Sequence, residues 1–142
     1  MIRLTRMIVA ASAFAPLAHA QADWRIEGEW SGAYVCNQGL TALHVSIRRD
    51  ATDAQLTAVF SFGPHKENPG VPKGAYAMRG SFNEDQKRLQ LRSGTWISQP
   101  AGYVMVDLDG FMRGSGLYIS GDVLGAGCTH FDLHRVDKDL VG

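Results

Sequence analysis

Three alternating side chains near the C-terminus form the most suggestive chemical pattern in the sequence. His130, Asp132 and His134 are two residues apart, so in a β-strand they would share one face. Imidazole and carboxylate groups are common metal ligands. His130 and His134 would lie about 13 Å apart on an extended strand, so they could not share one ion with ideal geometry. A two-ligand site would need further ligands from elsewhere, such as His44. A polar, solvated strand face is the simpler interpretation, and no cofactor is predicted.

A pair of aspartates, Asp107 and Asp109, would also share one strand face. Two carboxylates can perform acid–base chemistry on a sugar or peptide bond, but nothing in the spacing specifies it, and an ordinary exposed strand is the simpler interpretation. The sequence contains no G-x-S-x-G, HExxH, P-loop or CxxC motif. The motifs therefore favour a non-catalytic function.

A contact surface for another molecule is the third candidate. Residues 63–73 are the longest irregular stretch and hold three of the five prolines, which disfavour strand pairing. Loops of this size often carry function, and aromatic residues are frequent in binding sites. Loops that merely connect strands are the alternative. We predict a binding surface formed by this stretch and the turn at 98–102, with six residues: Trp96, Gln99, Tyr103, His65, Lys66 and Asn68.

The elements that would position these residues follow from a period of two. Apolar and polar residues alternate through most of the chain, most clearly at 41–48, and helical periodicity is almost absent. About eight short strands joined by glycine-rich turns predict an all-β fold, a small antiparallel barrel or sandwich. Trp30, Tyr34 and Phe60 are expected in its core. The predicted strands are 30–36, 41–48, 56–62, 74–82, 89–96, 103–109, 117–123 and 128–135.

The two cysteines, Cys36 and Cys128, lie in the first and last predicted strands. In an exported chain two cysteines predict one disulfide, and the alternative is a free reactive cysteine. The bond would close the barrel with a loop of about 93 residues. Cys128 has the opposite parity from Phe131 and Leu133, so either a bulge or a position just outside the strand is required.

The first twenty residues have the composition of an export signal. Arg3 and Arg6 precede an apolar stretch, and a small-x-small cleavage site ends at Ala20. The apolar stretch is shorter than the roughly 20 residues that span a bilayer. We therefore predict a signal peptide at 1–20 and one domain at 21–142, in the periplasm or secreted, with no transmembrane segment.

The charge balance disfavours partners that are recognised by a strong electric field. The 142-residue chain has 14 basic and 14 acidic residues and a formal net charge of zero. Such a chain has no long-range attraction for nucleic acid or anionic lipid, so no nucleic-acid partner is predicted. A hydrophobic content of 45% and a charged content of 20% indicate a globular domain.

Three segments, GAYVCNQGLT from Gly32, WISQPAGY from Trp96 and GCTHF from Gly127, together resemble an uncharacterised group of small exported bacterial β-proteins. They bracket residues 30–135, nearly the whole predicted domain. The resemblance implies export and a β fold, and it implies no particular activity.

Tyr34-Val35-Cys36 is similar to the tyrosine-x-cysteine of periplasmic chicken-type lysozyme inhibitors, which are small exported eight-stranded barrels. This resemblance covers the first two strands and the general plan. That family inserts a Ser-Gly-Ala-x-Tyr loop into lysozyme, whereas Ser31-Gly32-Ala33-Tyr34 is shorter and precedes the cysteine. The resemblance therefore implies architecture without inhibitory residues.

Three functional hypotheses follow. The leading one is a non-catalytic binding module with an envelope or extracellular protein as partner, and an inhibitor or immunity-type role is one version of it. The second is a calycin-like barrel with a small ligand inside, where Gly32, Gly74 and Gly80 would make room. The third is an envelope hydrolase that uses the aspartate pair or the histidine–aspartate strand.

Overall fold

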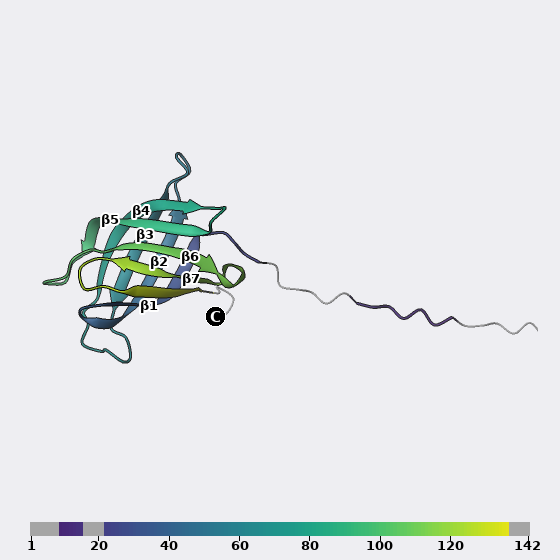
Figure 1. The fold of residues 1–142 in the computed structure, drawn as a ribbon, viewed down its shortest axis with the longest axis horizontal. Helices are drawn as coiled ribbons and strands as arrows, with labels where there is room; N and C mark the ends of the chain where they lie inside the picture. Colours follow the sequence, from purple (N-terminus) through teal and green to yellow (C-terminus); the bar gives the residue numbers. More distant parts are fainter. Residues whose placement is uncertain (1–8, 16–21, 137–142) are drawn as a thin grey trace, which may run out of the picture.

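The computed structural model describes residues 9–15 and 22–136, and its folded part is an eight-stranded antiparallel barrel (Figure 1). Each strand pairs with its neighbours in sequence, and β1 pairs with β8 to close the barrel. This confirms the predicted all-β architecture. The strands are β1 (Gly28–Cys36), β2 (Gly39–Arg49), β3 (Leu56–Gly63), β4 (Gly74–Asn83), β5 (Arg88–Ser98), β6 (Asp107–Arg113), β7 (Tyr118–Leu124) and β8 (His130–Arg135).

A short 3-10 turn, Gly114–Gly116, links β6 to β7. Within residues 9–15 and 22–136, no helix is long and apolar enough to cross a membrane. The predicted signal peptide at 1–20 lies largely outside the described residues.

Alternation along each strand directs large apolar side chains into the barrel. Trp30, Tyr34 and Phe60 are 0%, 4% and 0% exposed, which confirms their predicted place in the core. Phe60 stacks on Tyr76 with ring centroids 4.6 Å apart and meets Tyr34 edge-on at 5.2 Å. Phe62 joins the same cluster at 6.1 Å from Phe60. Aromatic rings therefore fill the part of the interior that lies near the disulfide.

The inward glycines do not make room for a ligand. A Cβ at Gly32 would collide with the backbone carbonyl of Asp132, and a Cβ at Gly80 would collide with that of Gln90. A Cβ at Gly74 would meet the ring of Phe62. These glycines allow neighbouring strands and side chains to approach closely, so the space above them is occupied by protein atoms.

The predicted strand at 103–109 begins later than expected, because β6 starts at Asp107. The hydroxyl of the buried Tyr76 donates a hydrogen bond to the carbonyl of Val106 and accepts one from its N–H, both at 3.0 Å. A side chain thus satisfies backbone groups that a neighbouring strand would otherwise satisfy. Val104, an apolar residue within the predicted strand 103–109, is 76% exposed. Leu117, predicted to begin the next strand, precedes β7 and is 52% exposed.

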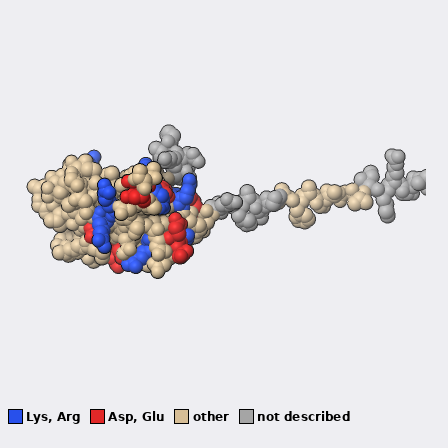
Figure 2. All heavy atoms as spheres, turned by 90° about the horizontal axis from the view of Figure 1, so that it is seen from above, with Lys and Arg blue, Asp and Glu red and all other residues tan. Residues whose placement is uncertain are grey.

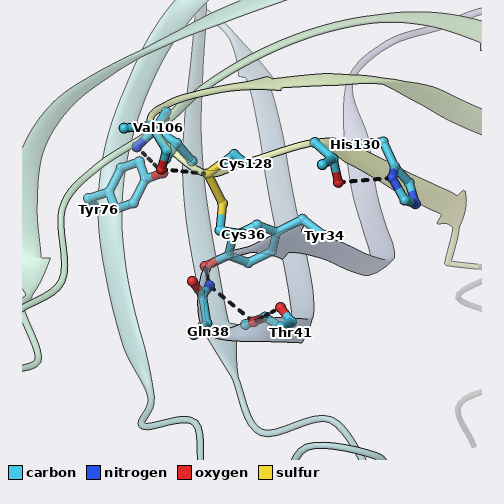
Figure 3. The surroundings of a disulfide bond; sticks show 11 residues. Tyr34, Cys36, Gln38, Thr41, Tyr76, Val106, Cys128 and His130 are labelled. Carbon is cyan, nitrogen blue, oxygen red and sulfur yellow. Dashed lines mark hydrogen bonds between the residues drawn. A yellow bond between two sulfur atoms is a disulfide. The ribbon is translucent and has the colours of Figure 1, made fainter.

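The predicted Cys36–Cys128 disulfide is present and joins the end of β1 to the loop before β8 (Figure 3). Cys128 lies two residues before β8 begins, so its opposite parity needs no bulge inside the strand. The N–H of Thr129 donates to the carbonyl of Val35 at 3.0 Å, which ties the two segments together beside the bond. The disulfide therefore reinforces the contact between the first and last strands.

The two ends of the barrel differ in how many charged side chains they carry. We call the end with connections 37–38, 64–73, 99–106 and 125–129 the disulfide end, and the connections at the opposite end are 50–55, 84–87 and 114–117. Figure 2 shows charged side chains gathered on the half of the barrel from which the N-terminal segment leaves, while the other half is mostly uncharged on the face shown. Ile97 and Val104 are 62% and 76% exposed at the disulfide end.

Candidate functional site

An open groove with a volume of about 1140 Å³ crosses the outside of the barrel over β3, β2, β1, β8 and β7. The strand register places a row of small residues along its floor, and we call this the small-residue row: Gly63, Ala42 and Ala33, continuing through Asp132 and Ser120. Because outward side chains are short here, the convex surface of the barrel becomes concave. Each end of the groove carries a cationic side chain, Lys73 at one end and Arg113 at the other.

A second row of outward side chains runs beside the floor and carries most of the polar chemistry of the groove. Neighbouring members are register partners on adjacent strands, and we call this the hydroxyl–histidine row: Ser61, His44, Ser31, His134 and Tyr118. All five line the groove. Alternation along β1 and β2 places these side chains outside while Trp30 and Val45 point inward.

Three of the polar side chains on β1 and β2 form a connected network. The Oγ of Ser31 lies 2.9 Å from Nδ1 of His44, and Nε2 of His44 lies 2.7 Å from Oε2 of Glu29. The His44 side chain is 42% exposed and that of Glu29 is 22% exposed. The imidazole is therefore held between a hydroxyl and a carboxylate at the edge of the groove.

Glu29 is itself fixed by neighbours on β2. Ser46 donates to its Oε1 at 3.0 Å, and the Arg48 guanidinium donates to the same oxygen at 2.5 Å. Partial burial would raise the pKa of Glu29, but the hydrogen bonds from Arg48, His44 and Ser46 outweigh it and lower this pKa from 4.5 to about 2. The carboxylate is therefore ionised at neutral pH.

The lowered pKa of Glu29 predicts an acid-sensitive contribution to stability. A carboxylate whose pKa is lower in the folded than in the unfolded chain stabilises the fold above its unfolded value and loses that effect as the pH falls toward the folded value. We expect the urea midpoint of the wild type to fall between about pH 5 and pH 2, and to fall less in Glu29→Gln. Glu84→Gln, which alters a carboxylate with a 68% exposed side chain, is the control. Equal pH dependence in wild type and Glu29→Gln would contradict this prediction.

The residues predicted as a loop contact surface all lie at the disulfide end, and several of them support the fold. Asn68 donates to the carbonyls of Gln38 and Leu40 at 2.7 and 3.1 Å, which fastens loop 64–73 to the β1–β2 turn. Gln99 donates to the carbonyl of Tyr103 at 3.1 Å within its own loop. These amide groups are thus occupied by the backbone.

The two predicted aromatic contact residues are partly buried against the core. Trp96 meets Tyr76 edge-on at 5.1 Å, and Tyr103 stacks on Phe62 at 5.4 Å. Lys66 is exposed, whereas His65 is half-buried and lines the outer groove. Of the six predicted residues, His65 alone belongs to the groove lining.

The aspartate pair on β6 is divided between two structural partners. Asp109 accepts two hydrogen bonds from Arg88, at 2.9 and 2.6 Å, and this contact lowers the pKa of Asp109 against the opposing effect of burial. Asp107 accepts from the N–H of Ser93 at 2.8 Å. Each aspartate therefore forms its own hydrogen bonds between β6 and β5.

The histidine–aspartate strand also separates into different environments. His130 and Asp132 approach to 3.8 Å, both largely exposed, while His134 belongs to the hydroxyl–histidine row. His44, named as a further ligand, is held by Ser31 and Glu29. Within the described part of the chain, no group of three or more His, Cys, Asp or Glu side chains is placed to hold a metal ion.

Glu29, Ser31 and the floor residues other than Asp132 were not predicted as site residues. The β1–β2 hairpin turns at residues 37 and 38, so residues whose numbers add to 75 lie opposite one another, including Ser31 and His44. The turn residues were visible in the sequence, and this register would have brought the hydroxyl and imidazole together. The contribution of β8 to the groove depends on barrel closure, which a local pattern does not specify.

Comparison with known proteins adds no relative. No family model, no curated protein and no solved structure matches this chain.

Proposed function

We propose that this protein is a binding module that holds an extended segment of a partner protein in the outer groove. The observation that carries the proposal is the groove itself, which crosses five strands and has small residues along its floor. The groove is open and elongated across five strands, whereas small-molecule sites are usually clefts that bury most of the ligand. A polymer segment is therefore a better occupant than a compact ligand.

The composition of the groove supports a protein partner. The short apolar side chains of Ala33, Ala42 and Pro64 lie among the lining residues, and polar side chains stand beside them. Protein interfaces commonly combine an apolar centre with a polar rim. Lys73 and Arg113 at the two ends would complement acidic residues near both ends of the bound segment.

The geometry also sets the length of the bound segment. The small-residue row spans five adjacent strands, which is about 19 Å along the sheet at about 4.8 Å per strand spacing. An extended chain advances about 3.3 Å per residue, so about six residues would cover the floor. The Cys36–Cys128 disulfide supports a location in the periplasm or outside the cell, where such bonds persist.

A random dodecapeptide library selected on the purified protein tests this proposal. We expect enrichment of peptides with acidic residues around a six-residue apolar or small segment. Ala33→Trp fills the floor without altering the core, and it should weaken binding of the enriched peptides at least 10-fold by fluorescence polarisation. Ala51→Trp, an exposed position between β2 and β3, is the matched control and should change affinity less than twofold.

Two results would overturn the proposal. Enriched peptides that bind Ala33→Trp as well as the wild type would place the binding site elsewhere. A selection that enriches no peptide on the folded wild type would remove the protein-segment function itself.

A further inference from the structure

We infer that the outer groove also contains a nucleophilic serine, with Ser31 as nucleophile, His44 as its base and Glu29 as the residue that positions His44, acting on carboxylic esters. This activity goes beyond the proposed binding function. The inference rests on the continuous network of Ser31 Oγ, His44 Nδ1, His44 Nε2 and Glu29 Oε2, at 2.9 and 2.7 Å. A hydroxyl beside a base that is oriented by a third group is the usual arrangement for an activated nucleophile.

The direction of the hydrogen bonds follows from the chemistry of Glu29. An ionised carboxylate only accepts hydrogen bonds, so Nε2 of His44 must carry the proton in this contact. In the neutral imidazole Nδ1 is then the unprotonated nitrogen and accepts from Ser31. The serine hydroxyl therefore points its proton at a base, as general-base catalysis requires.

The surroundings hold this arrangement in place. Ser46 and Arg48 fix the carboxylate of Glu29 at its other oxygen, and the two strands fix the backbones of Ser31 and His44 as register partners. Ser61, on the other side of His44 in the same row, has an equivalent hydroxyl group. Of these two serines, Ser31 is the candidate nucleophile, because among the described residues Ser31 forms a hydrogen bond to His44 and Ser61 does not.

The reaction has two balanced steps. The Oγ of Ser31 forms a bond to the ester carbonyl carbon while its proton passes to Nδ1 of His44; the C–O bond then breaks, and the leaving alcohol takes that proton. Water next attacks the acyl–serine, His44 again transfers the proton, and the carboxylic acid and free Ser31 are released.

The negative charge on the attacked carbonyl oxygen requires side-chain donors here. β1 is paired with β2 and β8 on its two sides, so main-chain N–H groups around Ser31 serve the sheet. His134 is the register partner of Ser31 on β8, whereas Arg113 lies three strands away on β6. His134 is therefore the side chain that would stabilise this charge, which is a large part of the rate in acyl transfer.

A fluorophosphonate probe tests the inference without any peptide ligand, so its result is separate from that of the binding proposal. We expect a covalent adduct that peptide mapping places on Ser31, and hydrolysis of p-nitrophenyl acetate. Ser31→Ala and His44→Gln should each lower labelling at least 20-fold. Ser81→Ala, at an exposed serine of β4 outside the groove, should leave it within twofold of wild type.

The role of Glu29 needs a readout other than stability. Long-range ¹H–¹⁵N correlation spectra should show His44 protonated on Nε2 in the wild type and a mixture of tautomers in Glu29→Gln, with labelling at least fivefold slower. An adduct on Ser61 or another residue, or no adduct on Ser31 in a protein with native circular dichroism, would overturn the inference. Unchanged labelling and an unchanged tautomer in Glu29→Gln would show that Glu29 does not position His44.

Discussion

Replacing Cys36 and Cys128 together by alanine is expected to lower the free energy of unfolding by about 4–5 kcal/mol. The disulfide joins residues 92 positions apart, and the chain-entropy model predicts that opening so long a loop gives the unfolded chain much more conformational freedom. For a domain of this size, such a loss corresponds to a fall in Tm of roughly 15 °C. Urea and thermal unfolding of both proteins would measure these changes.

The same double variant should retain the outer groove below its lowered midpoint. The groove is lined by β1, β2, β3, β7 and β8 away from Cys36 and Cys128, and the backbone hydrogen bonds of β1 to β8 do not depend on the sulfur atoms. Chemical reduction of the wild type should reproduce the lower stability. A loss below about 1 kcal/mol would mean that the unfolded chain keeps its ends together without the bond.

The strand pattern could be predicted because each strand has one face toward solvent and one face buried in the core. On β2, Leu43, Val45 and Ile47 are buried and their neighbours His44 and Ser46 are half-buried outside, and this is the alternation that the sequence displays. The Cys36–Cys128 pairing could be predicted because only two cysteines exist. Both inferences depend on properties that are local or require no knowledge of strand order.

The start of β6 could not be predicted because a residue 30 positions away decides it. The hydroxyl of Tyr76 occupies both backbone groups of Val106, so the segment before Asp107 lies outside the ladder although its sequence alternates. Tyr76 appears in the sequence only as an inward member of its own strand. A buried hydroxyl that competes with strand pairing depends on tertiary structure.

The outer groove could not be predicted from the sequence for a related reason. Its floor combines Gly63, Ala42 and Ala33 from three strands, and each is unremarkable within its own segment. Concavity arises when the register aligns three short side chains in one row. Likewise the sequence offers His44 only as a distant metal ligand, because its partners Ser31 and Glu29 lie on the opposite strand of the hairpin and depend on the strand register.

Phe60→Ala is expected to lower the free energy of unfolding by about 3–5 kcal/mol. Phe60 is fully buried and packs against the rings of Tyr34, Phe62 and Tyr76, so truncation loses both the transfer of the ring from water and its contacts with a rigid aromatic cluster. Phe60→Leu keeps most of the volume and should cost roughly 1–2 kcal/mol. Urea unfolding would rank the three proteins, and equal stability of Phe60→Ala and wild type would contradict a packed interior.

The same variant distinguishes the outer groove from a site inside the barrel. An apolar cavity of benzene size stays dry and binds small apolar molecules, so benzene should raise the Tm of Phe60→Ala by several degrees through linkage. It should leave the wild type unchanged, because the Phe60 ring already occupies that space. Equal stabilisation of the wild type by benzene would show that the native barrel already holds a cavity. That outcome would favour the small-ligand carrier over the groove-binding module, because calycin-like carriers hold their ligand inside the barrel.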